Sequence, residues 1–417
     1  MNIDCVNEKS TRRSASKIFL IILIVFYLLQ KMPIVSYYMN TYISMVLLVS
    51  MLILSLLADR TCHSRVPILL IVTFFYAGFY IIDLAIDNVP LLNMIWSMFL
   101  AIMPIFVGVI IVYNKMEYLV KFIVPLTLVT YAVTALTTYV GLLENPEASR
   151  LMAADPTAYH QYFPHNIGGF DFVYSFVLLH PLMICVLRRR NFWYFAVLIS
   201  VIGGLCIVAS EYTTATLLFL ISCMAYFFPS KATKSQSRLR GYFIIFVSVI
   251  VLLFLPAIFD WMAGLELFSE SAEKLRDVAN VLRGQESEAI ATQNRLLVYE
   301  QSWTTFLKHP LFGAKALSLG TSGGHSFFLD ILAEWGLFGF TLVATLYYYL
   351  HKLQRYICGD SSVSLYAMLF FLLVLIICAL NPHAWLFELG FAAPMFLYYA
   401  VHISEQKHIQ KKGDDIQ

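Results

Sequence analysis

The sequence predicts an all-helical, polytopic integral membrane protein with about twelve transmembrane helices, and two observations carry that prediction. The chain has 417 residues, of which 60% are hydrophobic and only 13% are charged, whereas soluble domains are near half apolar and a quarter charged. The apolar residues also fall in blocks of about twenty, long enough to cross a bilayer as a helix. This composition excludes an ordinary soluble enzyme. No broad basic surface suggests nucleic acid as a partner.

The candidate spans follow one another with short turns between them. We expect nine spans within residues 1–259, a large outer loop at 260–325, and three spans with a cytoplasmic tail at 326–417. The apolar run after Lys17 is not followed by a small-residue cleavage site, so we expect it to stay as an uncleaved span. The spans lie near 18–32, 37–58, 66–86, 91–113, 118–143, 169–187, 192–209, 212–229, 242–259, 326–350, 363–380 and 384–403.

Orientation follows from the distribution of lysine and arginine, which accumulate on the cytoplasmic side of membrane proteins. With the N-terminus inside, the predicted cytoplasmic segments hold 20 of the 28 basic residues. All but Lys31 of the remaining eight fall in two longer outer loops, at about 144–168 and 260–325. We therefore expect both termini in the cytoplasm, and any external chemistry in these two loops.

The long outer loop contains two predicted helices. Residues 265–283 carry an apolar stripe at helical spacing. A second helix is expected from Thr292 to just before Pro310, because a proline disfavours helix at the preceding residue. On that helix Arg295 and Tyr299 are four apart and share a face. A glycine-containing stretch then leads to His325, at the start of the tenth span.

This arrangement places a basic residue and a histidine beside a helix N-terminus at the external membrane surface. A helix N-terminus attracts phosphate through its free N–H groups and its dipole, and histidine can act as a general base near neutral pH. Loop glycines permit close backbone approach to a ligand. The alternatives are an interfacial histidine that caps the span, and an arginine on a solvated helix face or directed to lipid headgroups.

Several motifs in residues 294–340 resemble the O-antigen polymerase and O-antigen ligase superfamily of bacterial envelope proteins. Relatives have a helix that carries an arginine and a turn of the type His-Pro-Leu-Phe-Gly. They also have a histidine at the start of a span, and a glutamate and two glycines follow it within that span. The matching residues here are Arg295, Trp303, His309-Pro310-Leu311-Phe312-Gly313, His325-Ser326-Phe327-Phe328-Leu329-Asp330 and Glu334-Trp335-Gly336-Leu337-Phe338-Gly339.

The resemblance implies a membrane glycosyltransferase of the GT-C type, with no cofactor and no metal. The donor would be a saccharide on undecaprenyl diphosphate at the outer leaflet, and an acceptor hydroxyl would displace the lipid diphosphate with inversion. His325 would be the general base or would orient the acceptor, and Arg295 would bind the diphosphate. Guanidinium groups neutralise such a leaving group with paired donors. Membrane lipid, a chain-length regulator and a flippase are the implied partners.

One departure concerns the outer start of the eighth span. Many relatives carry an arginine in a Ser-x-Ser/Thr-Arg pattern there, whereas this chain reads Ser210-Glu211-Tyr212-Thr213-Thr214. Another cation must substitute, or this branch works differently. The candidate substitutes for diphosphate binding are Arg150, Arg276 and Arg283.

Other polar residues near the outer face are candidate sugar contacts. The segment from Tyr159 to Asp171 mixes rings with hydrogen-bonding groups, as a sugar site requires, although an interfacial aromatic belt has the same composition. From it we select His165 and Asp171, together with Tyr299, Glu211 and Tyr212 elsewhere, as substrate-binding candidates. Carboxylates within or near spans are costly and often functional. They are Asp83, Asp330, Glu334 and Glu388.

Three functions remain open at this point. We favour a repeat-unit polymerase for O-antigen or capsule, because a serine follows His325 where ligases more often have asparagine. The alternative within the superfamily is a ligase that moves the glycan onto lipid A–core. The alternative from another class is a transporter or a flippase of lipid-linked oligosaccharides, which the concentration of cations in the outer loops disfavours.

Overall fold

The computed structural model describes residues 17–39, 41–57, 68–155, 157–228, 290–315, 322–359 and 361–403, together with scattered positions between 254 and 283. Every regular element within these ranges is a helix, which confirms the predicted fold class. Six described helices are long and apolar enough to cross a membrane. They are α4 (Ile68–Ile86), α5 (Leu91–Tyr113), α6 (Glu117–Glu144), α9 (Phe170–Arg189), α15 (Phe327–Cys358) and α16 (Val363–Leu380).

Shorter helices occupy most of the other predicted spans. They include an apolar helix at Lys17–Leu29, α3 (Thr41–Leu57), α10 (Trp193–Ala209) and α11 (Thr213–Ser222), which continues into η3 (Cys223–Phe227). The predicted ninth span, 242–259, lies almost wholly outside the described residues. The last predicted span is not a regular α-helix: the π-helical turns η6 (Glu388–Ala392) and η7 (Tyr399–Ile403) flank α17 (Ala393–Tyr398).

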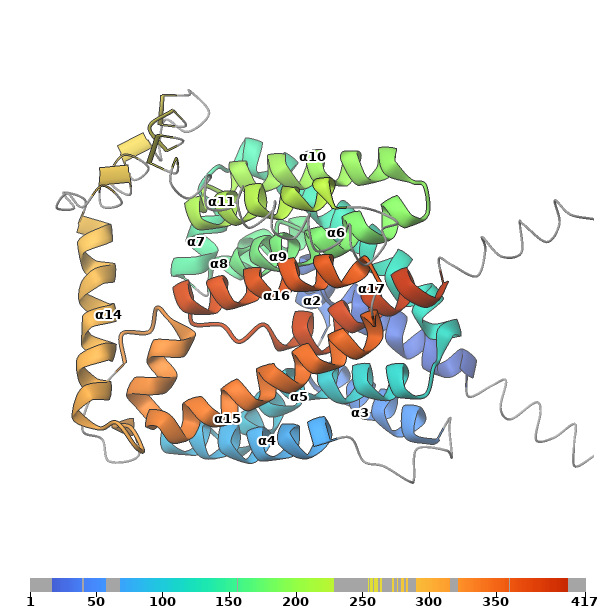
Figure 1. Cartoon of the computed structure of the whole chain (residues 1–417), viewed down its shortest axis with the longest axis horizontal. Coiled ribbons are helices and arrows are strands. Elements are labelled where there is room, and N and C mark those ends of the chain that lie inside the picture. The colour runs from blue at the N-terminus through green and yellow to red at the C-terminus, as the bar shows by residue number, and fades with distance from the viewer. Residues whose placement is uncertain are drawn as a thin grey trace, which may run out of the picture.

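Helix α9 forms the centre of the bundle, and its side chains are buried without interruption from Val173 to Val186. It packs against α10, α11, α16 and α17, while α15 packs against α16 on one side and α4 on the other (Figure 1). Continuous burial of α9 explains why its sequence is apolar on all faces, since a helix inside a bundle has no solvent face.

Small residues allow the irregular C-terminal segment to approach the bundle closely. A Cβ on Gly108 of α5 would lie 2.2 Å from the carbonyl oxygen of Gly390 in η6. Membrane helices associate through such close backbone contacts because lipid supplies no hydrophobic drive between them. The contact fixes the π-helical turn that begins at Glu388.

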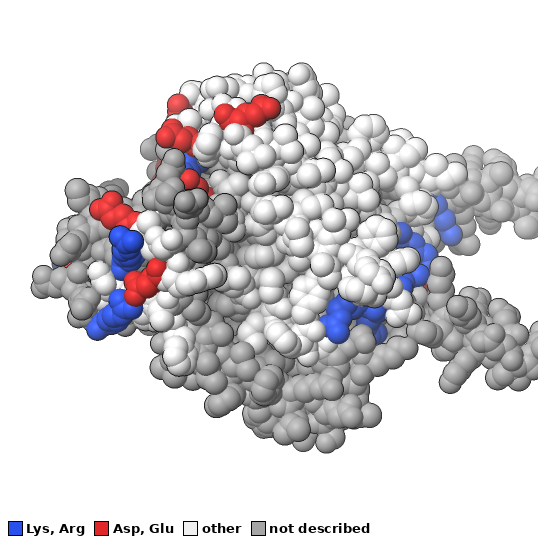
Figure 2. Space-filling view, turned by 90° about the horizontal axis from the view of Figure 1, so that it is seen from above, with Lys and Arg blue, Asp and Glu red and all other residues white. Residues whose placement is uncertain are grey.

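Helix α14 (Ile290–Lys308) stands at one end of the molecule, runs across its long axis and packs against α15 (Figure 1). We call this end of the molecule the α14 end. Charged side chains gather at the two ends of the face in Figure 2, with acidic and basic groups mixed at the α14 end and only basic groups at the opposite end. The uncharged band between them has the character of a lipid-facing surface.

Candidate active site

His325 is an exposed residue in the turn that leads into α15. The next residue, Ser326, is the N-cap of that helix, and its Oγ accepts a hydrogen bond from the backbone N–H of Leu329 at 3.3 Å. The predicted position of the histidine at the start of this span is therefore confirmed. Serine caps a helix by satisfying one of its free N–H groups, so the cap fixes where the helix begins and leaves the imidazole outside it.

The buried carboxylate of Asp330 organises the turn around His325. Its Oδ1 accepts a hydrogen bond from the backbone N–H of Gly324 at 3.2 Å, and its Oδ2 accepts one from that of Ser326 at 3.0 Å. These are the two residues that flank His325. Carboxylates that accept backbone N–H groups form strong, charge-assisted hydrogen bonds, so Asp330 holds the backbone on both sides of the histidine.

Ser302 connects this turn to α14. Its hydroxyl is buried, donates to Asp330 Oδ1 at 2.8 Å, and accepts the backbone N–H of Gly323 at 2.8 Å. Arg295 and Tyr299 lie on the same helix. Helix α14, the glycine turn and the start of α15 are thus joined in one network, which we call the Ser302–Asp330 hub. Asp330 stands out in the sequence as part of the family-like motif and as a carboxylate near a span, whereas no sequence pattern marks Ser302.

Two glycines of the family-like motifs allow two segments of the protein's own backbone to approach each other closely. Gly313 and Gly336 both have positive φ angles, and Gly336 interrupts α15 with non-helical geometry. A Cβ on Gly313 would lie 2.2 Å from the carbonyl oxygen of Glu334, and one on Gly336 would lie 2.5 Å from the carbonyl carbon of Leu311. At Gly313 the close backbone approach is therefore made to α15.

Backbone hydrogen bonds also join the turn after α14 to the kinked part of α15. The N–H of Ala314 donates to the carbonyl of Ala333 at 3.0 Å, and that of Leu337 donates to the carbonyl of Pro310 at 2.8 Å. The kink at Gly336 frees carbonyl and N–H groups of α15, and the turn after α14 satisfies them. The turn from His309 to Gly313 and the kinked helix are therefore one structural unit, which fixes both ends of the loop that leads to His325.

Lys315 ties this unit to α4. Its ammonium lies 2.7 Å from Asp83, 2.8 Å from Asp87 and 3.6 Å from Glu334, and the indole N–H of Trp335 also donates to Asp83 at 2.7 Å. Burial alone would lower the pKa of Lys315, because it disfavours the charged ammonium. The hydrogen bonds to the two aspartates outweigh this effect, and the pKa is raised. Glu334 also accepts from Ser322 at 2.6 Å. These carboxylates hold the loop against the bundle.

The structure brings Arg150 to the start of α11, next to Glu211. Arg150, on α7 (Ala148–Ala154), is paired with Glu211 at 2.7 Å, immediately before α11. Glu211 has a φ of 56°, and the hydroxyl of the adjacent Tyr212 donates to the Ser149 carbonyl at 2.5 Å. A cation from α7 therefore stands at the start of α11, and its charge is already partly neutralised by a carboxylate.

The remaining predicted cations occupy different settings. Arg283 is paired with Asp260, and Arg276 is exposed. Arg295 lies on α14, but its side chain is outside the described part of the structure. Tyr299, one turn later, is half-buried. The structure thus locates the helix expected to bind diphosphate without describing the guanidinium itself.

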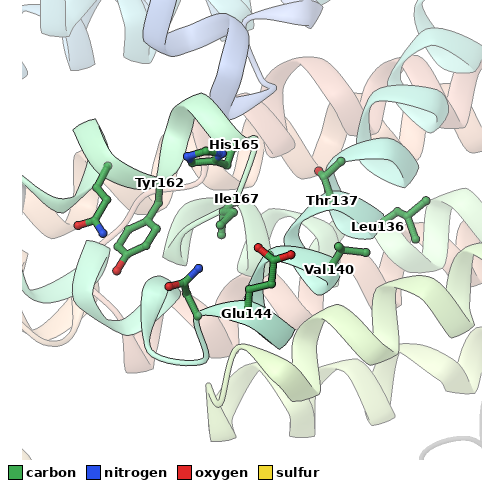
Figure 3. Close-up of a pocket in the computed structure, with 10 residues that line it drawn as sticks. Leu136, Thr137, Val140, Glu144, Tyr162, His165 and Ile167 are labelled. Atoms are coloured by element: carbon green, nitrogen blue, oxygen red, sulfur yellow. The ribbon is translucent and has the colours of Figure 1, made fainter.

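Two separate cavities flank the segment formed by α8 (Ala158–Tyr162) and η2 (Phe163–His165). The first has a volume of about 450 Å³, and its lining includes His165. Figure 3 shows Glu144 of α6 directed toward Ile167, with Tyr162 and His165 contributed by the α8–η2 segment. His165 therefore borders this smaller cavity.

The second cavity has a volume of about 720 Å³, and its lining includes Asp171. We call it the central cavity. Asp171 lies at the start of α9, with a carboxylate oxygen 3.8 Å from His383 Nδ1. The two predicted sugar contacts of this segment, His165 and Asp171, are thus on opposite sides of the α8–η2 wall. The sequence could not separate them, because they are only six residues apart.

A family model described as O-antigen ligase matches residues 195–344. These residues belong to the O-antigen polymerase and ligase superfamily. The matched stretch begins in α10, includes Glu211 and α14, and ends in α15 beyond the kink. It therefore covers the Ser302–Asp330 hub and His325. A search of the curated proteins finds no match to the chain.

Proposed function

We propose that this protein is a polysaccharide polymerase for O-antigen or capsule, acting at the outer face of the bacterial inner membrane. It would transfer the growing glycan from undecaprenyl diphosphate to a hydroxyl of a new lipid-linked repeat unit. The observation that carries the proposal is the exposed imidazole of His325, whose flanking residues are both held by one buried carboxylate within the superfamily domain. A base held in place in this way lowers the entropy cost of aligning an acceptor.

The proposed reaction is one inverting displacement. The acceptor hydroxyl oxygen attacks the anomeric carbon of the donor, the bond from that carbon to the phosphate oxygen breaks, and the lipid diphosphate leaves with the electron pair. His325 takes the hydroxyl proton, as a histidine side chain can in general base catalysis. Arg295 on α14 and Arg150 at the start of α11 are proposed to neutralise the charge that develops on the diphosphate. Because guanidinium supplies this charge, we expect no requirement for a metal.

The ligase remains a second candidate, favoured by the description of the matching family model. The residue after His325 distinguishes the two only by resemblance. Ser326 acts as the helix cap, and asparagine caps helices equally well, so this difference changes the cap and not the chemistry. The acceptor therefore has to be determined by assay.

The deciding experiment uses purified full-length protein in nanodiscs and the matched lipid-linked repeat unit, with and without lipid A–core, resolved on a gel. A ladder from the lipid-linked unit alone supports the polymerase, and activity should persist in EDTA. A product that requires lipid A–core establishes the ligase. No product under either condition would contradict both and return attention to a flippase or transporter.

A further inference from the structure

The central cavity is built from stretches of chain far apart in sequence. Its wall runs from the turn after the first apolar helix, through α4, α5, α6 and α9, to the residues just before η6. Its volume of about 720 Å³ lies within the range of pre-formed ligand sites. None of the residues that line this cavity lies within the stretch 195–344 that the family model matches.

The cavity wall contains a buried polar chain that the reaction described above does not use. Ser175 Oγ donates to Glu388 Oε1 at 2.5 Å, and Tyr131 OH donates in turn to Ser175 Oγ at 2.6 Å. Glu388 is 6% exposed and begins the π-helical turn η6. Single π-helical turns are frequent at functional sites, and a carboxylate has more acceptor positions than one serine occupies.

Aromatic rings complete the wall. The rings of Phe163, Phe172 and Trp385 line the cavity beside the polar chain. The buried indole nitrogen of Trp385 has no hydrogen-bond partner in the part of the chain that the structure describes. This nitrogen is closed off from the cavity as well, so Trp385 contributes its ring to the lining. Rings for the apolar faces and fixed polar groups for hydroxyls form a surface suited to sugars.

The charges of the cavity argue against a diphosphate as its occupant. Two carboxylates, Asp171 and Glu388, line it with one lysine, Lys31, whose ammonium lies 3.9 Å from the centre of the Phe387 ring. Lys31 lines the cavity but is surrounded by protein. These surroundings lower the pKa of its ammonium, although the two carboxylates act to raise it. A diphosphate is bound by a surplus of cations, whereas the lining of this cavity has two carboxylates and one lysine.

One backbone hydrogen bond joins the start of α15, beside His325, to the segment that leads into the cavity wall. The backbone N–H of Phe327 donates to the carbonyl of Asn381 at 3.0 Å. His383 and Trp385, which follow directly, line the cavity. A glycan held there can therefore present a hydroxyl at the side where His325 is found.

We propose that the central cavity binds the acceptor glycan, a hydroxyl-rich oligosaccharide, through the polar groups of Glu388 and Ser175 and the ring of Trp385, while the diphosphate binds elsewhere. This inference rests on the proposed function and deepens it. The donor sugar must stay with its diphosphate, which the cavity excludes. The acceptor end of a lipid-linked unit or of a core oligosaccharide is several sugars away from any phosphate and can enter.

The test measures binding by calorimetry on full-length protein in nanodiscs, with the repeat-unit oligosaccharide freed from its lipid carrier as the probe. We expect Glu388→Gln to weaken binding about tenfold or more, because a charged hydrogen-bond acceptor is lost. Ser36→Trp fills the cavity from an exposed position on α2 (Pro33–Tyr38) and should weaken binding even if Glu388→Gln fails to fold. Inorganic pyrophosphate should not compete.

Two matched controls isolate the cavity. Glu147→Gln removes an exposed carboxylate beside α7, and Tyr38→Trp enlarges an exposed ring on α2 that does not line the cavity. Both should bind the oligosaccharide like the wild type. Wild-type affinity in Glu388→Gln and Ser36→Trp, no binding by the wild type, or displacement by pyrophosphate would overturn the inference.

The ladder assay on the same preparations separates this inference from the proposed function. A wild-type ladder with unchanged oligosaccharide affinity in the cavity variants means that the polymerase stands and the cavity assignment falls. Cavity-dependent binding without a ladder or a core-linked product means that the transferase proposal falls and the sugar site remains.

Discussion

At the scale of single residues, the site separates a reactive side chain from the groups that hold it. His325 is exposed, whereas Asp330 and Ser302 are buried beneath it and use their polar atoms on the surrounding backbone. A buried carboxylate is stable only when its acceptor positions are filled, and here backbone N–H groups fill them. In the reaction proposed above, this carboxylate would contribute by fixing the geometry of the turn.

The first prediction concerns His325 itself. His325→Ala should lower polymer formation by about 10²- to 10⁴-fold, the usual contribution of a general base, and leave the melting temperature unchanged because the residue is exposed. His160→Ala, at an exposed position in the shorter loop, is the control. The gel ladder provides the measurement, and full activity of His325→Ala would exclude its role as base.

The second prediction concerns Asp330. Both oxygens of Asp330 accept hydrogen bonds, from the backbone N–H groups of Gly324 and Ser326 and from the hydroxyl of Ser302. In Asp330→Asn an amide NH₂ replaces one of these oxygens, so a donor would face a donor. We expect kcat to fall about 10- to 100-fold with little change in KM, as for a displaced catalytic group. The pH profile should also change, because the turn that holds His325 is altered. Glu300→Gln, exposed on α14, should behave like the wild type, and an unchanged kcat in Asp330→Asn would refute the positioning role.

At the scale of elements, the loop before α15 is held by backbone contacts and ion pairs rather than by an apolar core. The turn after α14 fits into the kink at Gly336, and Lys315 anchors the loop to α4. Such contacts depend on close approach and charge, so they are sensitive to single substitutions that leave hydrophobicity unchanged.

The third prediction tests the kink. Gly336→Ala should destabilise the protein by about 2–4 kcal/mol, because it combines a positive φ with a collision against Leu311. Gly359→Ala is a matched control, since Gly359 also has a positive φ but a Cβ there would meet nothing within 4 Å. Thermal unfolding in detergent compares the two variants. Equal losses would mean that backbone strain, and not the packed turn, determines the effect.

The fourth prediction tests Lys315 through pH. Because its carboxylate partners raise the pKa of Lys315 above the usual 10.5, its stabilisation is fully present below that pH and is lost as pH rises through the higher folded value. Lys315→Met should lower the melting temperature by about 2–4 °C at pH 7. The difference from the wild type should shrink above pH 10.5. Lys308→Met, exposed at the end of α14, should have no such effect; a difference that stays constant with pH would contradict the ion-pair account.

At the scale of the whole molecule, the sequence predicted the helices better than their contacts. The bounds of α5, and the end of α14 before Pro310, follow from local hydrophobicity and helix-breaking residues. The partners of Arg150 and Lys315 are 61 and 232 residues away in the chain. No local pattern encodes such pairs, because folding alone brings them together. The kink at Gly336 and the central cavity escaped prediction for the same reason.

The fifth prediction tests the proposed orientation. In a cysteine-free background, an impermeant maleimide added to intact spheroplasts should label a cysteine at Glu147 and should not label one at Asn191. Both positions are exposed. In the predicted topology Glu147 lies in an outer loop and Asn191 in a cytoplasmic turn, on opposite sides of the membrane. Labelling of both after permeabilisation is the control. Labelling of Asn191 alone in intact cells would mean that the protein is inserted the other way round.

The location of the hub and the central cavity on different parts of the chain has a consequence for how such proteins diversify. The hub lies within residues 195–344, whereas Lys31, Tyr131, Asp171 and Glu388 of the cavity wall do not. If the cavity selects the glycan, substitutions in its wall can alter which sugar is accepted and leave the bonds around His325 unchanged. A bacterium under immune or phage pressure could then acquire a new surface polysaccharide without evolving a new catalyst.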